Sequence, residues 1–316
     1  MRGAVKWVAG LATVGMFLVL LMGATVTSTG SGEGCGRSWP LCNGRFIPEF
    51  AVATAIEYSH RAVTGVEGLL ILAASAGLWW CWRDRREVRV LVPLMLGFLF
   101  LQAGLGAWAV KAPQSDEVLA LHFGISLVAF ASVLLALLFV LQSDGPVDAL
   151  RDRPIPGALR WAIWGLLAYI YVVVYLGAYV RHTQVTLACR DWPLCNGSAF
   201  PGFAGPEGIV FAHRLAAGLA VLAVAAVGCW TWRLRAARPD LAWASGVALA
   251  LILLQSLSGA SVVLTNASLF SALAHSGLMA LLFGSLSYLC LQSLPRPVAA
   301  RERLAPRYAS SPSQAG

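Results

Sequence analysis

Residues 57 to 61 read Glu-Tyr-Ser-His-Arg and open an apolar run that continues past Trp79. Glu57 and His60 are three residues apart, so on a helix their side chains share one face. A carboxylate can exchange protons with a substrate, and an imidazole can ligate a metal. Because ionisable groups are costly inside lipid, their place in an apolar run indicates a functional site.

Four of the five histidines form two pairs, and each lies near the start of an apolar run. The pairs are His60 with His122 and His213 with His275. A single histidine in such a run is typical of packing, but two imidazoles facing each other across a helical bundle suit the axial positions of a haem iron. Zinc or copper would need further ligands, which only Glu57 comes close to supplying. His182 has no partner, and we expect it in a solvated loop.

The composition indicates how these residues are positioned. Hydrophobic residues make up 58% of the chain and charged residues 12%, with a mean hydropathy of +0.72. Soluble domains carry about 25% charged residues, so the chain is predicted to be an integral membrane protein in a lipid bilayer. The net charge of +8 could suggest a nucleic-acid partner. We exclude nucleic acid because the basic residues fall in short clusters between apolar runs, as membrane topology requires.

Eight apolar segments are long enough to cross about 30 Å of hydrocarbon as helices. They cover residues 5–26, 53–80, 90–110, 119–141, 159–180, 209–232, 241–264 and 270–292. The runs are continuously apolar, which excludes the alternating pattern of a membrane barrel. The first segment exceeds the roughly 7–15 residues of a signal-peptide core, so it is predicted to remain as a helix. The fold class is therefore an all-α integral membrane protein.

The distribution of basic residues predicts the orientation. Sixteen of the 23 Lys and Arg residues fall on the side that holds the N-terminus. By the positive-inside rule both termini are expected in the cytoplasm, in a multi-pass protein of the cell (inner or plasma) membrane. The segment after Leu294 is rich in Pro, Arg and Ser, and is predicted to be a disordered cytoplasmic tail.

The chain contains an internal repeat. Residues 39–44, Trp-Pro-Leu-Cys-Asn-Gly, recur without change at 192–197, a shift of 153 that also relates the two histidine pairs. For residues upstream of this motif, such as Cys35 and Cys189, the shift is 154. Four helices per half insert both halves the same way up, which predicts a pseudo-two-fold axis along the membrane normal. The predicted domains are an N-terminal half (1–143), a connector (144–157), a C-terminal half (158–293) and the tail (294–316).

The two halves differ in their carboxylates. The shift carries Glu57 onto Val210 and Glu67 onto Ala220. A buried carboxylate needs a partner, and the sequence identifies none that would make Glu57 structural, so we assign it chemistry. Glu67 lies seven residues beyond His60 on the same face and is a possible cavity residue. We expect a polar first site and an apolar second site.

Four cysteines lie in the two outer loops, where disulfides persist. We expect the pairs Cys35-Cys42 and Cys189-Cys195 to close small structural loops. A redox role in handling electrons or in assembly is the alternative. The other three cysteines are expected to stay reduced, namely Cys81, Cys229 and Cys290.

Arg61 and Arg214 each follow a histidine at the outer interface. They could pair with haem propionates, or serve as interfacial anchors. Several glycines near the histidines could leave space beside a flat macrocycle, or allow close helix packing. These glycines are Gly65, Gly68, Gly124, Gly218 and Gly277.

Together the two four-helix repeats, the loop cysteines, the Glu-x-x-His-Arg motif at Glu57 and the three later histidines resemble the haem A synthase family. The resemblance covers the chain except its tail. It implies an oxidoreductase that converts a methyl substituent of haem O to a formyl group, giving haem A for terminal oxidases. It also implies partners: the substrate haem O, an electron acceptor and, as a possibility, the haem O-producing enzyme.

The resemblance also implies roles for the residues. His60 and His122 would hold the substrate haem, His213 and His275 would ligate a haem b cofactor, and Glu57 would be the catalytic carboxylate. Glu67 receives no role from the family.

Other functions would use the same residues. A di-haem b-type electron-transfer protein needs the four histidines but not a glutamate in one half only. A haem transporter or chaperone would leave the bound haem unchanged. A loop-cysteine disulfide oxidase would leave four intramembrane histidines without a task.

Overall fold

The computed structural model describes residues 1–112, 115–143 and 145–296, and within them the chain is almost wholly helical. Eight long helices, one 3-10 turn and one short helix follow in this order: α1 (Arg2–Ser28), η1 (Ser31–Glu33), α2 (Val52–Trp82), α3 (Arg86–Lys111), α4 (Asp116–Gln142), α5 (Pro146–Leu150), α6 (Gly157–His182), α7 (Gly205–Arg233), α8 (Pro239–Leu264) and α9 (Leu269–Ser293).

The eight long helices confirm the predicted fold class. Within the described ranges, eight helices are long and apolar enough to span a membrane. Each includes one predicted segment and extends it by a few residues. Helices are required because hydrocarbon offers backbone N–H and C=O groups no other partners. α2, with 31 residues, is about 46 Å long at 1.5 Å per residue, so it projects beyond the hydrocarbon core.

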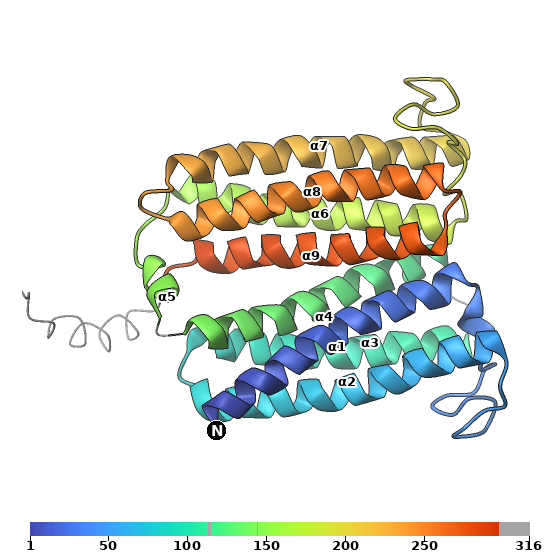
Figure 1. The fold of residues 1–316 in the computed structure, drawn as a ribbon, viewed down its shortest axis with the longest axis horizontal. Helices are drawn as coiled ribbons and strands as arrows, with labels where there is room; N and C mark the ends of the chain where they lie inside the picture. Colours follow the sequence, from blue (N-terminus) through green and yellow to red (C-terminus); the bar gives the residue numbers. More distant parts are fainter. Residues whose placement is uncertain (113–114, 144, 297–316) are drawn as a thin grey trace, which may run out of the picture.

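The long helices form two groups, α1–α4 and α6–α9, which lie side by side in Figure 1. The groups meet through three helix pairs: α4 with α6, α1 with α9, and α4 with α9. The repeat relates α1 to α6 and α4 to α9. It therefore converts the α4–α6 pair into the α9–α1 pair, and it converts the α4–α9 pair into itself. This pattern is what a pseudo-two-fold relation would produce, although the axis itself stays a prediction.

Two glycines allow the exchanged helix pairs to approach. A Cβ on Gly124 of α4 would lie 2.9 Å from the hydroxyl of Tyr171 on α6, and a Cβ on Gly277 of α9 would lie 3.3 Å from Phe17 on α1. Tyr171 and Phe17 are themselves related by the shift of 154. Of the two alternatives given for these glycines, the structure therefore supports close helix packing, here between the two groups.

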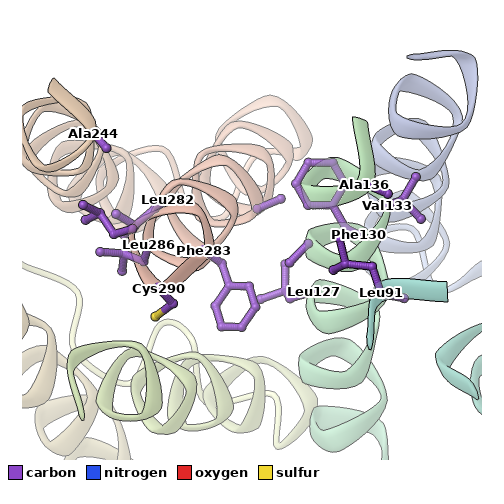
Figure 2. Packing of buried hydrophobic residues seen from close by; sticks show 14 of the residues in the cluster. Leu91, Leu127, Phe130, Val133, Ala136, Ala244, Leu282, Phe283, Leu286 and Cys290 are labelled. Carbon is purple, nitrogen blue, oxygen red and sulfur yellow. The ribbon is translucent and has the colours of Figure 1, made fainter. Parts of the chain in front are cut away.

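The centre of the molecule is the contact between α4 and α9. Figure 2 shows Leu127 of α4 and Phe283 of α9 beside each other among buried apolar side chains. Gly284 of α9 brings the helices together, since a Cβ there would lie 2.6 Å from Leu134 of α4. This apolar seam joins the two groups along the membrane-spanning region.

Buried ion pairs stabilise the end of the bundle that holds the N-terminus. Arg85 Nη2 donates to Asp148 at 2.9 Å, and its Nε lies 3.6 Å from Glu87. Arg238, which is 1% exposed, donates to both oxygens of Asp240. The shift of 153 relates Arg85 to Arg238 and Glu87 to Asp240. The sequence analysis missed this second repeated motif, although the same shift could have found it.

The connector between the groups is held by similar contacts. It contains α5, which was not predicted, and Arg151 after it donates to Glu87 at 2.8 Å and to the carbonyl of Leu294 at 3.0 Å. Arg296 Nε donates to Asp152 at 2.9 Å. The first residues of the predicted tail are therefore packed against the connector. Residues 297–316 lie outside the described residues.

Candidate functional site

The paired histidines lie in α2, α4, α7 and α9, at the end of the bundle opposite the buried ion pairs. His60 and His122 are close enough to interact electrostatically, and so are His213 and His275. The structure therefore brings together the two predicted pairs. The Nδ1 atoms of His60, His122 and His213 are buried, and no described residue hydrogen bonds to them.

His275 differs from the other three because its ring is held by polar side chains. Ser258 Oγ lies 2.9 Å from its Nδ1, and Gln255 Nε2 lies 3.2 Å from its Nε2. In the first half Leu105 takes the place of Ser258, and Gln102 donates to the backbone carbonyl of His122 instead. The expectation that the second site is apolar is therefore wrong.

Glycines on neighbouring helices leave room for three of the rings. A Cβ on Gly177 would lie 2.7 Å from His213, one on Gly259 3.2 Å from His275, and one on Gly23 3.4 Å from His60. Gly177 and Gly23 are related by the repeat. Gly65 and Gly218 have open space instead, since a Cβ on either would meet nothing within 4 Å.

Glu57 is buried, with 4% of its surface exposed, and both of its oxygens are bound. The backbone N–H of Cys35 donates to Oε2 at 2.8 Å, and Arg61, one helical turn further on, donates to Oε1. The partner that the sequence analysis could not identify is therefore Arg61. The pair at positions 57 and 61 could have been recognised by its i,i+4 spacing.

Arg61 and Arg214 also hold the outer loops. Arg61 donates to the carbonyls of Ser38 at 2.8 Å and Leu41 at 3.0 Å. Arg214 donates to the carbonyls of Leu194 and Cys189, the latter at 3.2 Å. Both guanidinium groups therefore fix a loop against the start of a histidine-bearing helix.

The two outer loops share one architecture. Cys35 bonds to Cys42 and Cys189 to Cys195, with Cα–Cα distances of 4.5 and 4.6 Å. The remaining cysteines are free thiols. Both loops contain a cis Trp-Pro bond. Ser38 accepts from the Gly44 N–H, and Asp191, at the equivalent position, accepts from the Gly197 N–H at 2.7 Å.

Backbone hydrogen bonds within the second loop change the pKa of the Asp191 carboxyl group. This hydrogen bond to the ionised form holds the pKa of Asp191 below its usual value, and the Asn196 N–H acts in the same direction. The second loop is therefore pinned by a carboxylate at the position where the first loop has a serine.

Glu67 is 3% exposed, and neither of its oxygens has a hydrogen-bond partner among the described residues. It points at Gly15 of α1, where a Cβ would lie 2.0 Å from Oε2. In the second half the sizes are reversed: Tyr169 replaces Gly15 and Ala220 replaces Glu67. The Tyr169 hydroxyl donates to the Ala216 carbonyl at 2.9 Å.

His182 is not in a solvated loop, as the sequence analysis expected. It is the last residue of α6, is partly buried, and lies within electrostatic range of His122 and Asp116 in the other group. Its neighbour Arg181 donates to the Ala24 carbonyl of α1 at 3.1 Å. The sequence does indicate this position, because His182 lies at the end of a long apolar run. The predicted helix ended two residues too early, at residue 180.

The donor set fits haem better than a bare metal ion. Among the described residues, no three His, Cys, Asp or Glu side chains gather as a metal-binding group, whereas paired imidazoles are complete axial ligands. Three of the four histidines have a buried imidazole nitrogen with no hydrogen-bond partner among the described residues, and glycines leave room beside three of the rings. Both observations agree with this assignment. The fold and its sites therefore define a multi-pass membrane protein with two paired-histidine sites suited to haem.

Comparison with known proteins gives the family. The model of the cytochrome oxidase assembly protein family matches residues 47–287. Haem A synthase of Symbiobacterium thermophilum is 46% identical over 289 residues, covering 90% of this chain and 93% of the relative. Haem A synthase of Geobacillus kaustophilus is 43% identical over 295 residues, 93% of each chain. That of Geobacillus thermodenitrificans is 41% identical over 316 residues, 99% of each. The chain belongs to the haem A synthase family.

Proposed function

We propose that this protein oxidises a methyl substituent of haem O to a formyl group and so produces haem A. The observation that carries the proposal is a buried carboxylate, Glu57, one turn from a histidine in the first site, where the second site has Val210. Family membership supports the same activity. A protein that only relays electrons or carries haem gives no reason for this asymmetry.

The substrate haem is assigned to His60 and His122. The reacting methyl lies at the edge of the macrocycle, so histidines on the iron do not block it. His213 and His275 are assigned to haem b, which when bound would accept and pass on electrons. Ser258 supports this assignment, because its contact with Nδ1 of His275 orients the ring; Nε2, which contacts Gln255 in this structure, would have to exchange that contact for the iron.

Glu57 is proposed to take up a proton as a methyl group and a water molecule become a formyl group, with the electrons passed to the acceptor and the other protons released to solvent. Arg61 and the Cys35 N–H both donate to its oxygens, so each oxygen of the carboxylate has a defined position. They also fix the carboxylate on the helix that carries His60. Arg61 therefore orients the base, and its proposed contact with a haem propionate would use its remaining N–H groups.

Two further assignments belong to this proposal. Arg214 is proposed to contact a propionate of haem b from the same position in its half. Glu67 is proposed to line the substrate cavity below His60, supported by its burial and by the absence of any hydrogen-bond partner among the described residues.

The cellular setting completes the proposal. Haem O reaches the site from the haem O-producing enzyme, and electrons leave to an acceptor. The excess of basic residues on the N-terminal side supports cytoplasmic termini in the cell membrane, with the haem sites at the outer face.

The test is to produce the protein together with a haem O-producing enzyme and to measure the mass and visible spectrum of the extracted haem. Wild-type protein is expected to yield a formyl-bearing haem. Glu57→Gln should retain haem but yield no formyl product. Glu49→Gln removes an exposed glutamate that pairs with Arg45 in the loop before α2; it is the matched control and should behave as wild type.

Two results would contradict the proposal. Normal formyl product from Glu57→Gln would remove Glu57 from the mechanism. Two permanently bound, unmodified haems in the wild-type protein would favour electron transfer or haem transport.

A further inference from the structure

A basic cavity lies at the end of the bundle opposite the histidines. Its volume is about 350 Å³, and it is enclosed by the connector, the first turn of α6, the turn before α8 and the end of α9. Four arginines line it, Arg151, Arg153, Arg160 and Arg238, against one carboxylate, Asp152. Arg151 is paired with Glu87 and Asp148, and Arg238 with Asp240, so the positive charge that remains in the lining is that of Arg153 and Arg160, which neither haem site uses.

The one carboxylate in the lining is already bound. Asp152 accepts from Arg296, whose side chain is 5% exposed and whose Nε–Oδ1 distance is 2.9 Å. Arg238 is also largely engaged, because each of its three nitrogens donates: to Asp240, to the Arg153 carbonyl or to the Gln292 carbonyl. These two groups build the wall of the cavity and have little to offer a ligand.

Arg160 and Arg153 do have donors to offer. Among the described residues, the hydrogen bonds of the Arg160 side chain use only Nε, which donates to the Ser293 carbonyl at 3.1 Å. Those of Arg153 use only Nη1, which donates to the Ala237 carbonyl at 2.8 Å. Within the described part of the chain, the other N–H groups of both side chains meet no protein acceptor. Paired N–H groups of this kind match the oxygens of a phosphate.

The cavity also lies at the level where phospholipid headgroups are found. Arg160 is in the first turn of α6, and the next residue, Trp161, is 78% exposed. Tryptophans of membrane proteins concentrate at the headgroup level, and basic pockets between helices on the cytoplasmic side bind anionic headgroups. A lipid phosphate can therefore reach the cavity without leaving the bilayer surface.

We propose that this cavity binds the phosphate group of an anionic phospholipid, with Arg160 and Arg153 as its donors. Because the ligand would contact the connector, α6 and the end of α9 together, its binding would stabilise the junction between the two groups of helices. The proposal does not depend on the haem chemistry.

The test titrates the full-length protein in detergent with phosphatidylglycerol or with phosphatidylcholine of the same acyl chains, and counts bound lipid by native mass spectrometry. Wild-type protein should bind phosphatidylglycerol at least about tenfold more tightly. Arg160→Gln should lose about tenfold of that affinity without changing phosphatidylcholine binding. Arg160→Lys keeps the charge but loses the paired donors, so it should be intermediate.

Arg86→Gln removes the same charge from an exposed position at the start of α3 and should leave lipid binding unchanged. Thermal unfolding without lipid checks that the variants fold, and Arg153→Gln, at an exposed position, replaces Arg160→Gln if that variant does not. Equal affinity for both lipids, or equal losses in Arg160→Gln and Arg86→Gln, would overturn the proposal. If millimolar inorganic phosphate stabilises the protein and abolishes the lipid preference, the ligand is free phosphate and the lipid assignment is wrong.

Discussion

Replacing Gly15 with alanine tests the contact between α1 and Glu67. The new methyl group would lie 2.0 Å from Oε2 and 3.0 Å from Cδ, so the carboxyl group must move by more than 1 Å to reach ordinary contact distance. Glu67 is 3% exposed, so its carboxyl group, the far end of a flexible side chain, has to find a new position inside the protein. Overpacking of this kind costs about 1–3 kcal/mol, against a gain of about 0.5–1 kcal/mol from removing a helical glycine.

The expected net loss is about 1–2 kcal/mol, measured as a fall of a few degrees in the unfolding midpoint of the detergent-solubilised protein. Gly10→Ala is the matched control: it lies on the same helix, and its methyl group would meet nothing within 4 Å. It should be neutral or slightly stabilising. A double-mutant cycle isolates the contact, because Gly15→Ala should become tolerated once Glu67→Ala has removed the carboxyl group.

The second half of the molecule suggests a stricter form of the experiment. Gly15→Tyr combined with Glu67→Ala copies the arrangement of Tyr169 and Ala220, and should be more stable than Gly15→Tyr alone. The reasoning is refuted if Gly15→Ala and Gly10→Ala have the same effect, or if Glu67→Ala does not rescue the larger side chains.

Two further predictions concern the ends of the bundle. Arg238→Gln should lower the free energy of unfolding by about 3–5 kcal/mol, because it leaves Asp240 buried without its bidentate partner. Arg235→Gln, at an exposed position, should change the free energy of unfolding by less than about 0.5 kcal/mol. Denaturant titration of both variants measures the difference. Asp191 has a lowered pKa, so the stabilisation of the second loop should be complete above the usual carboxyl pKa and be lost as the pH falls through the lowered value. Amide hydrogen exchange at Gly197 should follow this titration in the wild type but not in Asp191→Asn.

The sequence predicted those parts of the fold that depend on long-range averages along the chain. Eight apolar runs gave eight helices because hydrocarbon admits no other backbone arrangement for them. The shift of 153 related residues that lie on corresponding helices, such as His60 on α2 and His213 on α7. Neither inference required knowledge of which side chains touch.

Contacts between distant segments were not predictable in the same way. Tyr171 fills the space beside Gly124, and His182 approaches His122, because α6 packs on α4 across the two groups. No local pattern specifies that packing. The partner of Glu57 is different, because a local pattern does indicate it: Arg61 was predicted to be a propionate partner or an interfacial anchor, but it stands at i,i+4 from the carboxylate and pairs with it.

The packing of α1 on α9 also constrains how the protein is made. Phe17 and Leu21 of the first helix lie against Gly277 of the last, about 260 residues later in the chain. At roughly 5–20 residues per second, a ribosome needs on the order of 10–50 s to synthesise that stretch. During this interval the face of α1 that receives α9 is covered by lipid, and the joining of the two groups is completed only after translation has passed the final membrane-spanning segment.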